Sequence, residues 1–224
     1  MPVQISQLSR AACAVLAAAV AGLTACSHSK PAHNLDLDQV RVLPDARLRT
    51  DAVGDGAFAS TASFVLVDAE NASADGAHIT LGGSLSDAAG AVVGQLKPQS
   101  LWIPGHEIRT FALVDSERVP RPTAAGAQIK VYGAVIPETP PRARITELHT
   151  FDDHGRLVLQ AYLVNAAERP GQIMAIAAFH DAHGQPMTRP FQLVALAAGA
   201  RQVVQFVGPP GAARGTIFTG DAVY

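Results

Sequence analysis

The sequence predicts an all-β protein made of two antiparallel β-sandwiches in series, and three observations support this prediction. Short apolar runs rich in β-forming residues recur along the 224-residue chain, and Gly, Asp, Asn or Pro interrupt them roughly every eight to twelve residues. No segment keeps the apolar spacing of an amphipathic helix. The order of runs and turns in the first half then begins again in the second, as in a tandem repeat.

Residues 1–25 predict a cleaved signal peptide. A polar start ending at Arg10 is followed by the apolar run 11–22. That run is about a dozen residues long, which suits a secretory signal and is too short to cross ~30 Å of hydrocarbon. Leu23-Thr24-Ala25-Cys26 follows directly. An ordinary signal cleavage site is the simpler interpretation, because small residues also precede such sites.

Leu23-Thr24-Ala25-Cys26 resembles the lipobox of bacterial lipoproteins. The resemblance implies that Cys26 is acylated, for example with palmitate, and becomes the mature N-terminus. Several acyl chains would hold the protein on a membrane, since each buried CH₂ contributes about 0.8 kcal/mol. Ser27 stands where the inner-membrane retention signal of such lipoproteins has Asp, so the resemblance implies the periplasmic face of the outer membrane.

Composition excludes several classes of function. The formal net charge is −2, and the 17 lysines and arginines are scattered, which argues against a nucleic-acid partner. The chain has two cysteines, Cys13 and Cys26. Because the first would leave with the signal peptide and the second would be acylated, the mature chain would have no thiol for a disulfide, a zinc site or a nucleophile. We expect no cofactor.

Four segments are expected after the signal peptide. Residues 26–46 are polar with Pro31 and Pro44, and predict a flexible tether. Residues 47–136 form the first sandwich, 137–141 a proline-rich linker and 142–224 the second sandwich. Strands of the first are expected in order at 64–67, 79–85, 91–93, 100–103, 108–114 and 129–136.

The repeat rests on landmarks in the same order in both halves. The pairs are 66–69 with 163–166, 87–90 with 181–184, Gly105 with Gly199, and Ile129 with Ile217. Each half resembles the small FxLYD-type bacterial β-sandwich domains in its Asp or Asn turn, its Asp-x-x-Gly turn and its later glycine turn. Ser86 and His180 stand where that family has an aromatic residue before the Asp. The resemblance implies two tandem immunoglobulin-like domains, usually without catalysis.

Histidine and aspartate gather in two predicted turns of the second sandwich. They could hold zinc or copper. The candidate ligands are His149, Asp153, His154, His180, Asp181 and His183. The simpler interpretation is structural, because the first half has Asp and Gly at the same places without histidine. There the Asp side chain would accept backbone N–H groups and Gly would supply a positive φ.

Function is expected to be non-enzymatic. The sequence has no Gly-x-Ser-x-Gly elbow and no phosphate-binding glycine loop. Tandem sandwiches on a tether favour a structural or adaptor subunit that contacts other envelope proteins, with Trp102 either anchoring a partner or covering the core. The alternative is a periplasmic metal-binding or small-solute-binding lipoprotein that uses the His and Asp turns.

Overall fold

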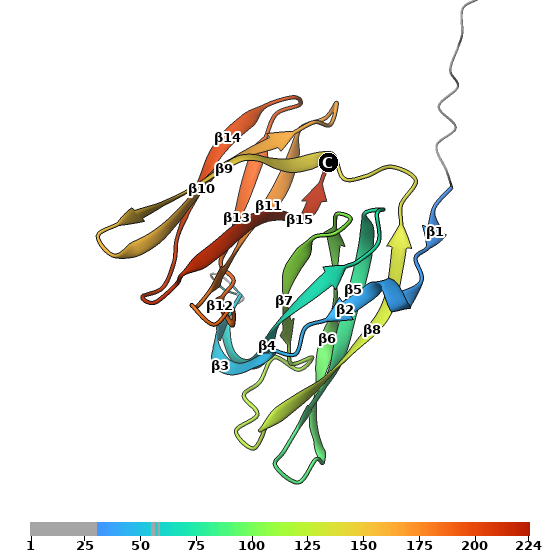
Figure 1. The fold of residues 1–224 in the computed structure, drawn as a ribbon, viewed down its shortest axis with the longest axis vertical. Helices are drawn as coiled ribbons and strands as arrows, with labels where there is room; N and C mark the ends of the chain where they lie inside the picture. The colour runs from blue at the N-terminus through green and yellow to red at the C-terminus, as the bar shows by residue number, and fades with distance from the viewer. Residues whose placement is uncertain (1–30, 55–56, 58) are drawn as a thin grey trace, which may run out of the picture.

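The computed structural model describes residues 31–54, 57 and 59–224. The predicted signal peptide and Cys26 lie outside these residues. The predicted all-β antiparallel fold is confirmed, because the described chain consists mainly of strands in four antiparallel sheets (Figure 1). Within this part of the chain, no helix is long and apolar enough to cross a membrane.

The first half, residues 33–136, contains two sheets. One has β4 at its centre, with β7 along one edge and β2 and β3 sharing the other; the second has the order β1-β8-β5-β6. The strands are β1 (His33–Asn34), β2 (Val40–Val42), β3 (Arg47–Val53), β4 (Ser60–Asn71), β5 (Ala77–Ser86), β6 (Val92–Ile103), β7 (Ile108–Val114) and β8 (Gly126–Ile136).

The second half, residues 143–223, repeats this strand order. The sheet β9-β10-β14 corresponds to β3-β4-β7 of the first half. In the other sheet, β11 corresponds to β5, β15 corresponds to β8, and β12 and β13 together correspond to β6. The strands are β9 (Ala143–Asp153), β10 (Arg156–Asn165), β11 (Gly171–His180), β12 (Pro186–Thr188), β13 (Phe191–Leu196), β14 (Arg201–Val207) and β15 (Arg214–Val223).

Part of the predicted tether belongs to the first half of the fold. β1 pairs with β8, β2 pairs with β4, and the 3-10 turn η1 (Leu37–Gln39) joins them. Val40 is buried in the core. These strands are two and three residues long, so they show no alternation that a sequence pattern could reveal and depend on a partner strand for their hydrogen bonds.

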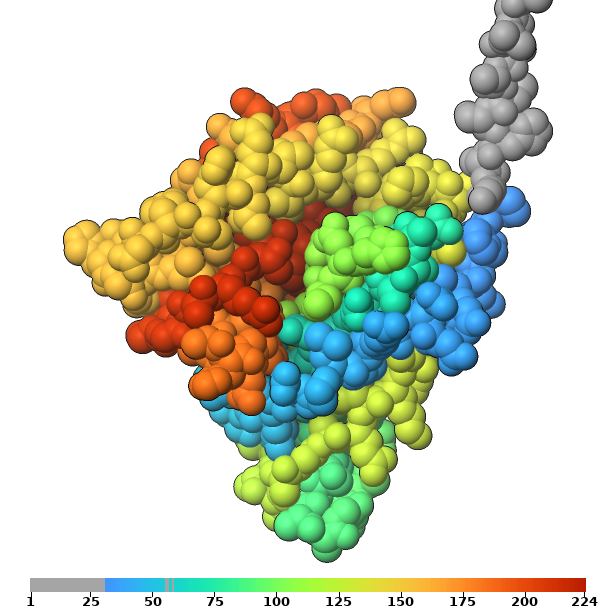
Figure 2. All heavy atoms as spheres, in the orientation of Figure 1, coloured from blue at the N-terminus to red at the C-terminus, as the bar shows by residue number. Residues whose placement is uncertain are grey.

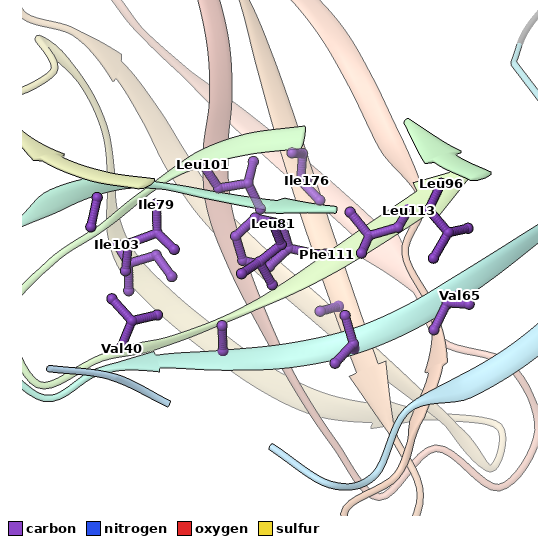
Figure 3. Packing of buried hydrophobic residues seen from close by; sticks show 14 of the residues in the cluster. Val40, Val65, Ile79, Leu81, Leu96, Leu101, Ile103, Phe111, Leu113 and Ile176 are labelled. Atoms are coloured by element: carbon purple, nitrogen blue, oxygen red, sulfur yellow. The ribbon is translucent and has the colours of Figure 1, made fainter. Parts of the chain in front are cut away.

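Alternating residues of the central strands fill a core in each half. Val65 and Val67 of β4 face Ile79 and Leu81 of β5 across the first core, and Phe111 of β7 is fully buried beside them (Figure 3). Leu159, Phe179 and other residues of the second half form a separate core. Successive side chains along a strand point to opposite faces of the sheet, which explains this alternation.

Equivalent asparagines close the two central strands. The Asn71 side chain donates to the carbonyls of Asp75 and Ile103, and that of Asn165 donates to those of Arg169 and Leu196. Both are fully buried. The hydrogen bonds therefore make Asn71, not Asp68, the counterpart of Asn165, a shift of a few positions from the sequence pairing 66–69 with 163–166.

The paired Asp-x-x-Gly turns are built alike. Asp87 Oδ1 accepts the N–H groups of Ala89 and Ala91, and Asp181 Oδ1 accepts those of His183 and Gln185. Gly90 and Gly184 have φ of 83° and 85°, which favours glycine. Each carboxylate thus serves its own turn, as the structural interpretation expects.

The halves pack through the outer faces of two sheets. Ile176, Ala178 and Phe218 point out of the second half and join the core cluster of the first. Figure 2 shows the second half, yellow to red, resting directly on the blue-to-green first half, and Figure 3 shows Ile176 beside Leu101. Apolar contact therefore runs continuously from one half into the other.

Candidate functional site

A cleft lies beside this contact, and both halves line it. Its main part has a volume of about 1210 Å³, which is large enough for a small-molecule ligand. A smaller part of about 350 Å³ shares Gln99, Ala112, Val114, Met174 and Arg189 with it. We therefore treat the two parts as one feature, the central cleft. Its apolar wall includes Phe64, Leu66, Val114, Met174, Phe191 and Leu193.

Arg189 lines both parts of the cleft. It lies between β12 and β13, where Pro190 interrupts the strand because proline cannot donate to a sheet ladder. Its Nε and Nη2 atoms are buried and have no hydrogen-bond partner among the described residues. Burial lowers the pKa of the guanidinium to about 10, while the negative charge of Asp221 acts in the opposite direction. Arg189 therefore remains a buried cation at neutral pH.

The other arginine of the cleft is already bonded. The Arg49 guanidinium donates to the carbonyl of Met187 in the second half and to Asp51 Oδ2, at 3.3 Å for the latter. Its charge therefore joins β3 to β12 and is partly neutralised by Asp51. Arg189 contacts the Phe218 ring, with its Cζ 5.8 Å from the ring centroid, but its Nε and Nη2 atoms have no hydrogen-bond partner in the described part of the chain.

A buried polar cluster holds the halves together next to the cleft. Asp68 of β4 and Thr110 of β7 meet His180 of β11 at the contact between sheets. His180 Nε2 donates to Asp68 Oδ2 at 2.8 Å, and Thr110 Oγ1 donates to Asp68 Oδ1 at 2.5 Å. All three side chains are buried. Because Asp68 and His180 come from different halves, their hydrogen bond joins the halves, and removing one side chain leaves the other buried without its partner.

The geometry of this cluster suits structure better than catalysis. In a nucleophilic triad, the histidine uses one ring nitrogen for the carboxylate and the other for the hydroxyl. Here the same His180 Nε2 faces both Asp68 and Thr110, the latter at 3.5 Å, and the hydroxyl donates to the carboxylate. The arrangement gives Thr110 no separate base to remove its proton.

We expect Asp68 and His180 to be energetically coupled. Asp68→Ala or His180→Ala should each lower the free energy of unfolding by about 3 kcal/mol, because each leaves the other group buried without its partner. The double variant should cost clearly less than the sum of the two, in a double-mutant cycle measured by urea unfolding of the full chain.

The exposed Asp153–His154 pair, with 2.6 Å between His154 Nδ1 and Asp153 Oδ1, is the matched control for this cycle. Water screens it, so its cycle should show no measurable coupling. Additive costs for Asp68 and His180 would show that the buried pair does not join the halves.

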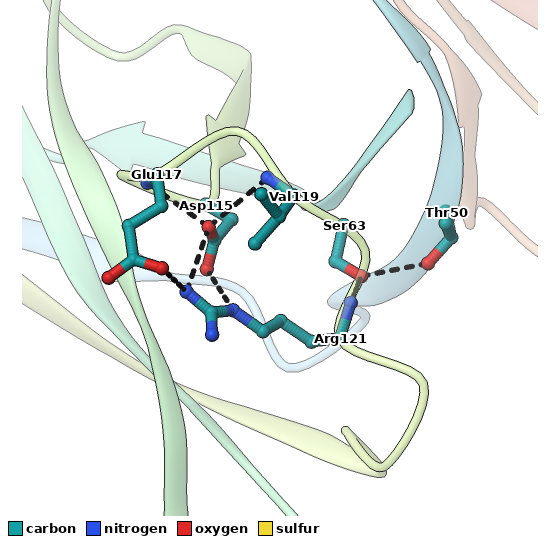
Figure 4. Close-up of polar contacts among 6 residues, drawn as sticks. All are labelled: Thr50, Ser63, Asp115, Glu117, Val119 and Arg121. Atoms are coloured by element: carbon teal, nitrogen blue, oxygen red, sulfur yellow. Dashed lines mark hydrogen bonds and ion pairs between the residues drawn. The ribbon is translucent and has the colours of Figure 1, made fainter. Parts of the chain in front are cut away.

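A second polar cluster lies at the far end of the first half. Asp115 is fully buried, and Arg121 donates to both of its oxygens, at 2.8 Å from Nε and 3.2 Å from Nη2 (Figure 4). Arg121 also bonds Glu117, and its N–H donates to Ser63 Oγ. The hydrogen bond to Asp115 raises the pKa of Arg121. The polar side chains of this cluster bond one another or nearby N–H groups, so the cluster serves to close the loop after β7.

Removing the buried carboxylate of this cluster should destabilise the fold. Asp115→Ala should lower the free energy of unfolding by about 3 kcal/mol, because Arg121 and the N–H groups of Glu117 and Val119 lose their acceptor. Glu117→Ala, which removes an exposed partner of the same arginine, should cost less than about 1 kcal/mol. Urea unfolding compares them; equal costs would contradict the argument.

The predicted metal ligands lie in separate places. His154 contacts Asp153 in the exposed β9–β10 turn, His149 pairs with Gln160 in the sheet, and His180 faces Asp68. Hydrogen bonds from Gln185 and His183 lower the pKa of Asp181. Among the described residues, no three His, Cys, Asp or Glu side chains are grouped so that they could hold a metal ion.

Trp102 lies on β6 at the edge of the first half, outside the central cleft. Its ring packs against His78, with ring centroids 5.4 Å apart, and lies over Gly76, where an added Cβ would overlap it. Burial lowers the pKa of His78. Trp102 is partly buried, so this contact covers the end of the core while part of the ring remains exposed.

The sequence contains a repeated feature at the cleft that the strand and turn patterns do not include. Lys97-Pro98 in β6 and Arg189-Pro190 between β12 and β13 are a basic residue followed by proline at corresponding breaks in pairing. Both basic residues line the cleft. The repeated basic residue and proline are visible in the sequence, but the burial of the Arg189 nitrogens depends on contacts with the other half of the chain.

Comparisons with known proteins do not assign a family. No family model matches the chain, and no curated protein matches it. Among solved structures, the chain is similar to red sea bream transglutaminase with a TM-score of 0.23 and 15% identity, over 73% of this chain and 27% of that one. The chain thus spans about a quarter of that protein's length. Similarity at this level carries no argument about function.

Proposed function

We propose that this chain is a non-enzymatic binding protein of the cell envelope, anchored through acylated Cys26, and that the central cleft is its ligand site. The observation that carries the proposal is that Arg189, in the wall of a cleft of about 1210 Å³, has buried Nε and Nη2 atoms without a hydrogen-bond partner among the residues that the structure describes. Clefts between packed units, apolar with a few polar groups, are common places for ligand binding. The buried Asp68–His180 contact supports it, because it keeps both walls in place.

A reactive cysteine in the cleft wall tests this proposal. Leu193→Cys introduces an accessible thiol into the cleft, where Leu193 is 55% exposed. Val203→Cys is the matched control on an outer sheet face, where Val203 is 45% exposed. The chain has cysteines only at 13 and 26, and both variants carry the predicted acylated Cys26, so the introduced thiol gives the signal. We expect small solutes extracted from the envelope to slow maleimide labelling at position 193 and not at 203.

Equal labelling rates at position 193 with and without every solute fraction would contradict a ligand site in the cleft. Full chains in phospholipid nanodiscs keep the anchor and avoid detergent, which could itself enter an apolar cleft. Labelling is read by mass spectrometry, and unchanged circular dichroism shows that each variant is folded.

An envelope adaptor is the second candidate, and a surface feature favours it. Phe151, Val158 and Val207 are neighbours across β9, β10 and β14, and Phe151 and Val207 are exposed together with Val203. Apolar side chains gathered on one sheet face are typical of protein contact surfaces. The proposed partner is an envelope protein that presents an apolar surface to this face.

Charge on this face should remove such a contact. We expect Val203→Glu with Val207→Glu to abolish a crosslinked species that the unaltered chain forms in intact envelopes. Val92→Glu, at an exposed valine of the other half, should leave it in place. A species that persists unchanged in the double variant would exclude this face as the contact.

A further inference from the structure

The orphaned atoms of Arg189 form one edge of the guanidinium. Nε and Nη2 project side by side, and this edge donates two parallel hydrogen bonds to the two oxygens of a carboxylate. Both atoms are buried and neither has a partner among the described residues. An unpaired buried cation is costly, so a position of this kind calls for an anion supplied from outside the chain.

The nearest charged groups leave this edge free. Asp221 affects Arg189 through its field and forms no hydrogen bond or ion pair with it in the described chain. Asp51 is already paired with Arg49. Lys97, which corresponds to Arg189 in the repeat, adds a second cation to the smaller part of the cleft. The positive groups therefore favour an anionic ligand.

The apolar wall sets the rest of the ligand. Phe64, Val114, Met174 and Leu193 line the cleft beyond Arg189. They would shield a hydrocarbon body from water. Because the orphaned edge is closed to bulk water, the ligand has to enter through the cleft and displace part of its wall. Met174 lines both parts of the cleft and has a flexible side chain that can move aside.

We propose that the central cleft binds a small carboxylate with an apolar body, whose two oxygens accept from Nε and Nη2 of Arg189. This inference rests on the proposed function, since it names the chemical class of the ligand in the same cleft. It differs from the predicted metal site in residues and in chemistry: the ligand is an anion and the group that binds it is a cation.

Three probes separate charge from shape. Hexanoate has the carboxylate and the apolar body, hexanamide is its neutral analogue, and inorganic phosphate is an anion without an apolar body. With the full chain in nanodiscs, calorimetric titration should show the tightest binding for hexanoate. Arg189→Met should weaken hexanoate binding by about tenfold or more, the loss expected for a charge-assisted pair. Arg201→Met removes an exposed guanidinium that lies over Tyr162 outside the cleft, and should leave binding unchanged.

Thermal unfolding adds a readout that a structural arginine would not give. Without ligand, Arg189→Met should leave the melting temperature unchanged or raise it, because it removes a buried unpaired charge. Equal binding of hexanamide or phosphate, unchanged hexanoate binding in Arg189→Met, or a lowered melting temperature in that variant would each overturn the inference.

The failures of the two proposals are distinguishable. If hexanoate does not bind but other solutes protect Leu193→Cys from labelling, the carboxylate inference fails and the cleft remains a ligand site. If nothing protects that position, both fail.

Discussion

The buried contact between the two halves is the constraint on which the rest of the structure depends. The outer face of one sheet carries Asp68 and Thr110 into an apolar contact, where Asp68 accepts hydrogen bonds from Thr110 and from His180 of the other half. Phe218 lies in the same contact. The centroid of its ring is 5.2 Å from Arg109 Cζ and 5.8 Å from Arg189 Cζ. The position of the cleft walls, and the burial of Arg189, follow from this packing.

The two halves differ where they meet and are alike where each supports itself. Asn71 and Asn165 make the same bonds because each closes its own central strand, and the two Asp-x-x-Gly turns are alike for the same reason. Asp68 and His180 serve the contact between halves, so they have no such counterpart. The bonds that the halves share therefore support each half by itself, and the residues that differ lie at the contact between them.

The sequence predicted the parts of the fold that depend on neighbours along the chain. Alternation and turn residues predicted the strands, but β1 and β2 were too short to show a pattern. His180 stands beside Asp181 in the sequence and was expected among possible metal ligands; its partner Asp68 is 112 positions away. The burial of the Arg189 Nε and Nη2 atoms depends on tertiary packing, which no pattern along the chain determines.

The contact also joins unlike surfaces. The first half uses the outer face of β4 and β7, and the second half uses that of β11 and β15, which corresponds to the β5 and β8 sheet. Such a head-to-tail arrangement has no two-fold symmetry and does not close on itself. The two ends of the molecule therefore differ. At one end lies the exposed β9-β10-β14 face, which corresponds to the β3-β4-β7 face that the second half covers in the first. A third copy of the unit would extend the stack at that face, so the exposed apolar residues of that end are the place where solubility has to be maintained.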